Sequence, residues 1–121
     1  MHELSLAQAV VGTVTDAAVA NGAARVSLVR LRVGMLSGVV CSALEFAFDV
    51  AADGTAAEGA RLEIEALPVV VHCPACGTDG ALAELTRFRC PACGTPTAEV
   101  VQGRELEIAS IEVVVAEEAT P

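Results

Sequence analysis

The sequence contains no tryptophan, no tyrosine and no lysine, and only three phenylalanines. Its hydrophobic fraction of 54% is large enough for a folded core, and that core has to be aliphatic. Seven arginines are scattered among sixteen acidic residues, so the net charge is -9 and no contiguous basic patch exists along the chain. Phosphate backbones and anionic lipid surfaces repel such a protein, which argues against nucleic acid and membrane partners.

A secretory signal and a membrane span are also missing from the sequence. Met1-His2-Glu3 offers no positively charged n-region, and no apolar run approaches the roughly eighteen residues of a membrane helix. We therefore expect a cytoplasmic protein, in which a reducing environment makes the five cysteines better suited to metal binding than to disulfides. The 121 residues allow one compact domain with at most a small metal-bound insert.

Two helices are predicted from capping boxes followed by apolar residues at helical spacing. Ser5 and Ser42 each occupy an N-cap position, with Gln or Glu three residues later. Asn21-Gly22 and Asp53-Gly54 supply the C-terminal stops. Residues 1–3 are therefore expected to lie outside the first helix.

Three strands are predicted from alternating apolar and polar residues, at 25–33, 61–71 and 105–115. The resulting fold is α+β, a small sheet with two helices, interrupted late by a zinc-ribbon-like insert with four cysteines. Residues 1–71 and 97–121 form the α+β domain, and residues 72–96 form the insert. Four acidic residues are interpreted as solvated surface: Glu63, Glu65, Glu117 and Glu118.

The strongest motif is a repeated pentapeptide, Cys73-Pro74-Ala75-Cys76-Gly77 and Cys90-Pro91-Ala92-Cys93-Gly94. A Cys-x-x-Cys turn lets two thiolates reach one ion, and the glycine after it permits the positive φ that closes the turn. The two turns complete a tetrahedral set of four sulfurs and should be joined by a compact hairpin, with residues 86–89 as its returning strand.

A closed set of four thiolates leaves no open coordination position, so we expect a structural Zn(II) that supplies the insert's folding energy. A rubredoxin-like iron centre and a redox dithiol pair are the competing interpretations. His72 precedes the first ligand, either as a half-exposed strand-end residue or as a donor or replacement ligand at the sulfurs. Cys41 is more simply a buried small hydrophobic residue than a reactive thiol.

The amino terminus offers a second set of metal ligands. The α-amine of Met1, the amide nitrogen of His2 and its imidazole form adjacent chelate rings, a nitrogen-rich set that suits Ni(II) or Cu(II). The Glu3 amide, its carboxylate or a partner group would complete the set. On these residues alone, a histidine at position 2 is more simply an accident of a disordered terminus than a metal ligand.

Several segments in the same order resemble the hydrogenase nickel-incorporation accessory proteins, the HypA/HybF family. These are 1–7, 34–39, 44–48, 57–64, the paired Cys-x-x-Cys turns and 106–112. The resemblance implies a nickel metallochaperone that delivers Ni(II), its transient cargo, to the [NiFe]-hydrogenase large subunit with a GTPase partner, and in some organisms to urease. It implies nickel binding by Met1, His2 and Glu3. It also implies zinc binding by four ligands: Cys73, Cys76, Cys90 and Cys93.

Two other classes of function compete with this one. A zinc-ribbon interaction or transcription-related module without a nickel function would also carry the cysteine turns, but the acidic charge and the lack of stacking aromatics suit it poorly. The sequence shows no nucleophile–base constellation, phosphate loop or catalytic carboxylate pair, so we predict that the protein is not an enzyme.

Overall fold

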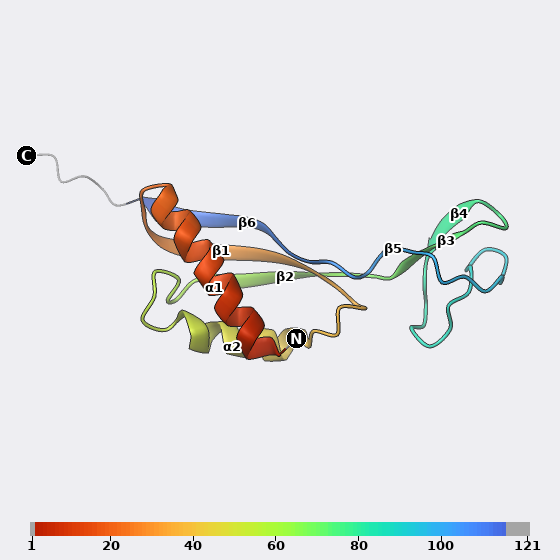
Figure 1. Ribbon diagram of the computed structural model, residues 1–121, viewed down its shortest axis with the longest axis horizontal. Coiled ribbons are helices and arrows are strands. Elements are labelled where there is room, and N and C mark those ends of the chain that lie inside the picture. The colour runs from red at the N-terminus through yellow and green to blue at the C-terminus, as the bar shows by residue number, and fades with distance from the viewer. Residues whose placement is uncertain (1, 116–121) are drawn as a thin grey trace, which may run out of the picture. The chain divides into compact units, whose positions relative to one another are not determined.

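The computed structural model describes residues 2–115 and confirms the predicted α+β class (Figure 1). The elements are two helices, α1 (Glu3–Ala20) and α2 (Cys41–Ala52), and six strands: β1 (Ala23–Gly34), β2 (Arg61–Leu67), β3 (Val70–Cys73), β4 (Thr78–Ala81), β5 (Val100–Gln102) and β6 (Leu106–Val115). The strands form two sheets, with orders β2-β1-β6 and β4-β3-β5. No helix within residues 2–115 is long and apolar enough to cross a membrane.

The chain divides into two compact units. The helical unit holds the residues up to Leu31, Val39–Ile64 and the residues from Ile108 onwards, and the cysteine unit holds Arg32–Gly38 and Glu65–Glu107. The predicted insert, 72–96, lies within the cysteine unit, which also includes residues on either side of it. The boundaries of the nickel domain and the insert therefore stay a prediction.

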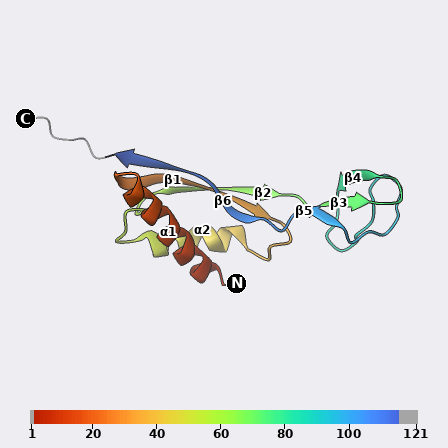
Figure 2. The ribbon, with the colours of Figure 1, turned by 45° about the horizontal axis from the view of Figure 1, so that its top comes forward.

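In the helical unit, both helices lie on the same side of the strands (Figure 2). The side chains buried between the helices and the strands are aliphatic apart from Phe48, as the composition predicts. The contributing residues of α1 are Leu6, Ala7, Val10, Val11, Val14 and Ala18, those of α2 are Leu44, Ala47, Phe48 and Ala52, and those of β1 include Val26, Leu28, Val29 and Leu31. Burial of this aliphatic area is the main term that holds the unit together.

Both helices begin earlier than the capping boxes predict. The N-cap residues are His2 and Val40, neither helix has a side-chain hydrogen bond at its N-cap, and Ser5 and Ser42 lie inside the first turns. The first helical hydrogen bonds run from Leu6 N to the His2 carbonyl and from Leu44 N to the Val40 carbonyl. Because Leu6 and Leu44 are buried in the core, tertiary packing starts each helix ahead of its serine.

The predicted strand 61–71 is two strands in different sheets, broken at Pro68. Proline has no N–H group to donate to a neighbouring strand, so a strand inside a sheet ends where a proline stands. The strands β4 and β5 were not predicted, and the predicted returning strand at residues 86–89 is wrong. In that segment only Arg89 forms a bridge, with Pro96, whereas β4 pairs antiparallel with β3.

Charged side chains form ion pairs between the strands of the first sheet. In the helical unit Arg30 Nε lies 3.0 Å from Glu63 Oε2, and in the cysteine unit Arg32 Nη1 lies 2.8 Å from Glu107 Oε1. The prediction that Glu63 and Glu65 belong to the solvated surface is confirmed, because their side chains are 38% and 65% exposed. Glu117 and Glu118, predicted in the same way, lie outside the described residues. The pairs are solvent-exposed, so each adds at most about 1 kcal/mol.

Gly34 is expected to be intolerant of a side chain. A Cβ at Gly34 would lie 2.1 Å from the carbonyl carbon and oxygen of Gly103, which is backbone and cannot rotate away. We expect Gly34→Ala to lower the free energy of unfolding by about 3 kcal/mol or more, measured by urea denaturation. The control is Gly12→Ala in α1, where a Cβ meets nothing within 4 Å. Because alanine favours a helix interior, this variant should gain about 0.5–1 kcal/mol, and equal destabilisation of both variants would contradict the argument.

Candidate metal centres

The four cysteines of the repeated turns come together at one point. Their sulfur atoms all lie within 4.8 Å of one another, and two of the four cross-turn distances are 3.6 Å for Cys73–Cys93 and 3.5 Å for Cys76–Cys90. Zn–S bonds of about 2.3 Å in a tetrahedron separate the sulfurs by about 3.8 Å. All four residues are free thiols, and the donor set therefore fits a tetrahedral ion.

The two turns have the same backbone geometry. The Gly77 amide donates to the Cys73 carbonyl at 2.7 Å, and the Gly94 amide donates to the Cys90 carbonyl at 2.8 Å. Both glycines have the positive φ that the sequence predicts, 73° and 77°. The first cysteine of each turn is buried and the second is exposed. The repeat in sequence is therefore a repeat in structure.

Two threonines at the site were not predicted. The Cys76 sulfur lies 3.1 Å from the Thr78 hydroxyl oxygen, and the Cys93 sulfur lies 3.1 Å from that of Thr95. When the sulfurs are thiolates, these hydroxyls donate to them. A signal was present in the sequence, because the repeat is six residues long, Cys-Pro-Ala-Cys-Gly-Thr, rather than five.

The turns influence how readily the thiols ionise. The Cys93 backbone amide, together with that of Ala92, lowers the pKa of Cys90 to about 6 against the effect of burial. The pKa of Cys73 is lowered by the Cys76 backbone amide, but burial and the neighbouring Cys93 and Cys76 thiols outweigh this and raise it to about 11. Four sulfurs this close cannot all carry a negative charge without a cation between them.

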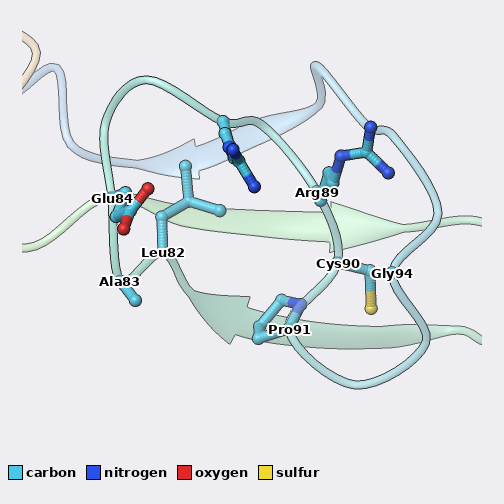
Figure 3. Close-up of a pocket in the computed structure, with 8 residues that line it drawn as sticks. Leu82, Ala83, Glu84, Arg89, Cys90, Pro91 and Gly94 are labelled. Atoms are coloured by element: carbon cyan, nitrogen blue, oxygen red, sulfur yellow. The ribbon is translucent and has the colours of Figure 1, made fainter.

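The second turn packs on the strand that follows the first. A Cβ at Gly80 of β4 would meet the Pro91 ring at 2.4 Å, so only glycine leaves room for that ring. Beside Cys90 and Pro91 lies an open pocket of about 330 Å³, whose lining includes Leu82 and Arg89 (Figure 3). The Arg89 side chain extends away from the Cys90 sulfur in this view. The pocket belongs to the surroundings of the cysteine site.

His72 and Cys41 do not join the sulfur cluster. His72 Nδ1 lies 2.6 Å from Asp79 Oδ1 on the neighbouring strand, and this hydrogen bond raises the pKa of the imidazole. The structure thus favours the simpler interpretation of His72, a half-buried residue on β3. Cys41 is the first residue of α2 and is half-buried, so it is less buried than predicted.

His2 and Glu3 lie at the start of α1. Met1 lies outside the described residues. His2 is exposed and extended, with φ -73° and ψ 136°, and precedes the helix as its N-cap. Glu3 lies in the first turn of α1, contrary to the prediction, and its Oε2 is 3.4 Å from the Val40 amide nitrogen at the start of α2. The Glu3 amide has no acceptor within the helix, as is general for a first turn.

Comparison with known proteins decides the family. The sequence model of the family described as "Hydrogenase/urease nickel incorporation, metallochaperone, hypA" matches residues 1–113. The chain belongs to the HypA family. The predicted resemblance is therefore confirmed, and the family is one of nickel metallochaperones rather than enzymes.

Curated members of the HypA family match nearly the whole chain. A hydrogenase maturation factor HypA of Chloroflexus aurantiacus is 49% identical over 112 residues, which cover 93% of this chain and 98% of that protein. One of Roseiflexus sp. is 50% identical over 112 residues, covering 93% and 91%.

Two solved structures of HypA proteins share the fold. The solution structure of the Ni metallochaperone HypA from Helicobacter pylori has a TM-score of 0.66 at 22% identity and covers 96% of this chain and 100% of that one. A second solution structure, titled HypA protein, has a TM-score of 0.71 at 23% identity, covering 96% and 98%. At these identities the likeness concerns the fold alone.

Proposed function

We propose that this HypA-family protein binds Ni(II) through Met1, His2 and Glu3 and delivers it in the cytoplasm to the large subunit of [NiFe]-hydrogenase. The observation that carries the proposal is the family match over residues 1–113, which begins at the proposed ligands. A nickel-handling GTPase is the expected partner in delivery, and urease maturation proteins are further candidate partners.

The chemistry of the terminus supports a site for transient cargo. An amine, an amide nitrogen and an imidazole on adjacent residues make a nitrogen-rich set of the kind that Ni(II) prefers. His2 is exposed, so a client protein can approach the ion and replace these ligands. The Glu3 carboxylate has the Val40 amide as a neighbour. The Glu3 amide nitrogen, free of a helical hydrogen bond, is therefore the better fourth ligand.

The four-cysteine site is proposed to hold Zn(II) permanently. The ligands would be Cys73, Cys76, Cys90 and Cys93, whose sulfurs lie within 4.8 Å of one another. Zinc bound there would neutralise thiolate charge and hold the two turns together, which is structural rather than catalytic chemistry. The insert contains a single aromatic residue, Phe88, whereas rubredoxin-like iron centres usually rely on aromatic packing, and we propose zinc over iron for that reason. The rigid cysteine unit would then serve partner recognition.

Nickel binding is expected to weaken steeply as the pH falls. Nickel competes with protons for the amine and the ring, so a rising proton concentration displaces the ion. Untagged protein should bind about one Ni(II) at pH 7.5 and release protons, with affinity falling at least about tenfold by pH 6. Calorimetric titration at both pH values in buffers of different ionisation enthalpy measures this. Tight binding at pH 6 without proton release would point to another ligand set.

A further inference from the structure

The solvent-facing side of α2 carries apolar residues that no described part of the chain covers. Phe46 is 73% exposed and Val50 is 54% exposed. They stand at positions i and i+4 and so lie next to each other on the helix surface. The opposite face of α2 packs in the core through Leu44, Ala47 and Phe48. One of only three phenylalanines in the protein is therefore placed in water.

An acidic row runs beside these two residues. Glu45 and Asp49 are exposed and four residues apart, and Asp53, also exposed, follows as the C-cap residue. Asp49 and Asp53 stand at the C-terminal end of the helix, where the macrodipole disfavours negative charge, and no basic residue occupies the last turn. No ion pair involving these three carboxylates is found within residues 2–115. These charges do not stabilise α2, and their arrangement suits a positively charged partner.

We propose that this α2 face, formed by Glu45, Phe46, Asp49, Val50 and Asp53, is a docking surface for a partner protein's helix that carries apolar residues flanked by lysine or arginine. The charges select this occupant. A second copy would bring acidic row against acidic row, and nucleic acid or an anionic membrane would be repelled in the same way. A basic amphipathic helix can pack its apolar residues on Phe46 and Val50 and pair its basic residues with the acidic row.

The position of this surface relates it to nickel transfer, and this part of the inference rests on the proposed function. Glu3 Oε2 lies 3.4 Å from the amide nitrogen of Val40, so the start of α1 is beside the start of α2. Both belong to the helical unit, and Figure 1 shows the start of α1 next to α2. Phe46 follows Val40 by six residues, a rise of about 9 Å along a helix. A helix docked on the α2 face is therefore within reach of the nickel end.

The test measures binding of full-length protein with a free amino terminus to two immobilised probes, the hydrogenase-maturation GTPase and the hydrogenase large subunit of the same organism. The variants are Phe46→Asp, with Phe46→Ala as a milder second change, and Asp49→Arg. Matched controls on α1 are Val19→Asp, where the valine is 75% exposed, and Asp16→Arg, where the aspartate is also exposed. Each charge change at the α2 face thus has an equal change on the other helix.

We expect Phe46→Asp to weaken binding to one of the probes by roughly tenfold or more, as for a buried aromatic anchor of an interface. Asp49→Arg should also weaken it and make it less sensitive to salt, whereas both controls should stay within about twofold. Circular dichroism checks that helical content is unchanged. If Phe46→Asp reduces the helical content, the binding of Phe46→Ala decides instead. We expect Phe46→Ala to weaken binding to the same probe, but by less.

Three results would overturn the proposal. The first is that wild-type protein binds neither probe, and the second is that the α2 variants bind as tightly as wild type. The third is that Phe46→Asp changes the oligomeric state of the isolated protein, which would make the occupant a second copy. Nickel titration of the same variants separates this inference from the proposed function. The α2 variants should keep full nickel binding, and a wild-type protein without a nickel site would refute the function whatever the docking result.

Discussion

Replacing Cys90 by serine is expected to abolish zinc binding and unfold the sheet β4-β3-β5 while leaving α1 and α2 folded. The four sulfurs come from two turns that are brought together by one ion, and Cys90 is buried at that point. Structural zinc contributes about 10–16 kcal/mol in small zinc-binding peptides, more than a segment of this size gains from its own core. Zinc content should fall from about one ion per chain to near zero, measured by mass spectrometry of the metal. Amide NMR should show loss of dispersion only for the cysteine unit.

The control for this experiment is Cys41→Ser. Cys41 is the one cysteine outside the cluster, so its replacement should leave the zinc content unchanged. A Cys90→Ser protein that retains a full zinc ion would remove Cys90 from the ligand set. Loss of the whole helical signal in that variant would instead show that the helical unit cannot fold without the cysteine unit.

Adding Gly-Ser before Met1 is expected to abolish the tight nickel site without affecting zinc content or fold. Any preceding residue converts the α-amine into an ordinary peptide nitrogen, and the amine–amide–imidazole chelate is lost. Loss of a chelate ring and of its basic nitrogen should weaken nickel binding by about a hundredfold or more, since disturbing only a group that hydrogen-bonds to a ligand already costs about 10–100-fold in other metal sites. Nickel titration of extended and unextended protein, with zinc analysis of both, measures this.

His2→Ala should weaken nickel binding to a similar degree, because it removes the imidazole while leaving the amine in place. A Gly-Ser addition at the carboxy terminus is the matched control and should change neither metal. If the protein extended before Met1 binds nickel as tightly as the unextended one, the terminal-amine site is wrong. The next ligands to test would be His72 and the side-chain carboxylates.

Sequence patterns predicted the parts of the fold that rest on local periodicity. The two helices and the alternation on β1 follow from the spacing of buried side chains, and these elements are found where the spacing indicates. The starts of the helices were wrong because burial of Leu6 and Leu44 outweighs a serine cap. The strand β4, Thr-Asp-Gly-Ala, has no strand-like composition. It is a strand only because β3 lies beside it, which no local pattern reveals.

In the metal centres, too, local motifs could be predicted from the sequence and contacts between distant residues could not. The cysteine cluster was predictable because repeated short-range motifs define it, and Thr78 and Thr95 could have been found by extending the repeat. The approach of Glu3 to Val40 joins residues far apart in sequence, and it depends on how α1 and α2 pack. The exposure of Phe46 was equally hidden, because composition treats every phenylalanine as a core residue until the helix face is known.

The strand order of the first sheet bears on how the protein is made. In the order β2-β1-β6, the strand made first is central, and one of its two neighbours is the last strand of the chain. During synthesis β1 must therefore wait with an unpaired edge until β6 leaves the ribosome. All four cysteines of the cluster precede β6 in the chain. We expect the nascent chain to bind zinc before β6 pairs with β1 and completes the sheet. Zinc would then bind during folding, whereas nickel would bind the folded protein.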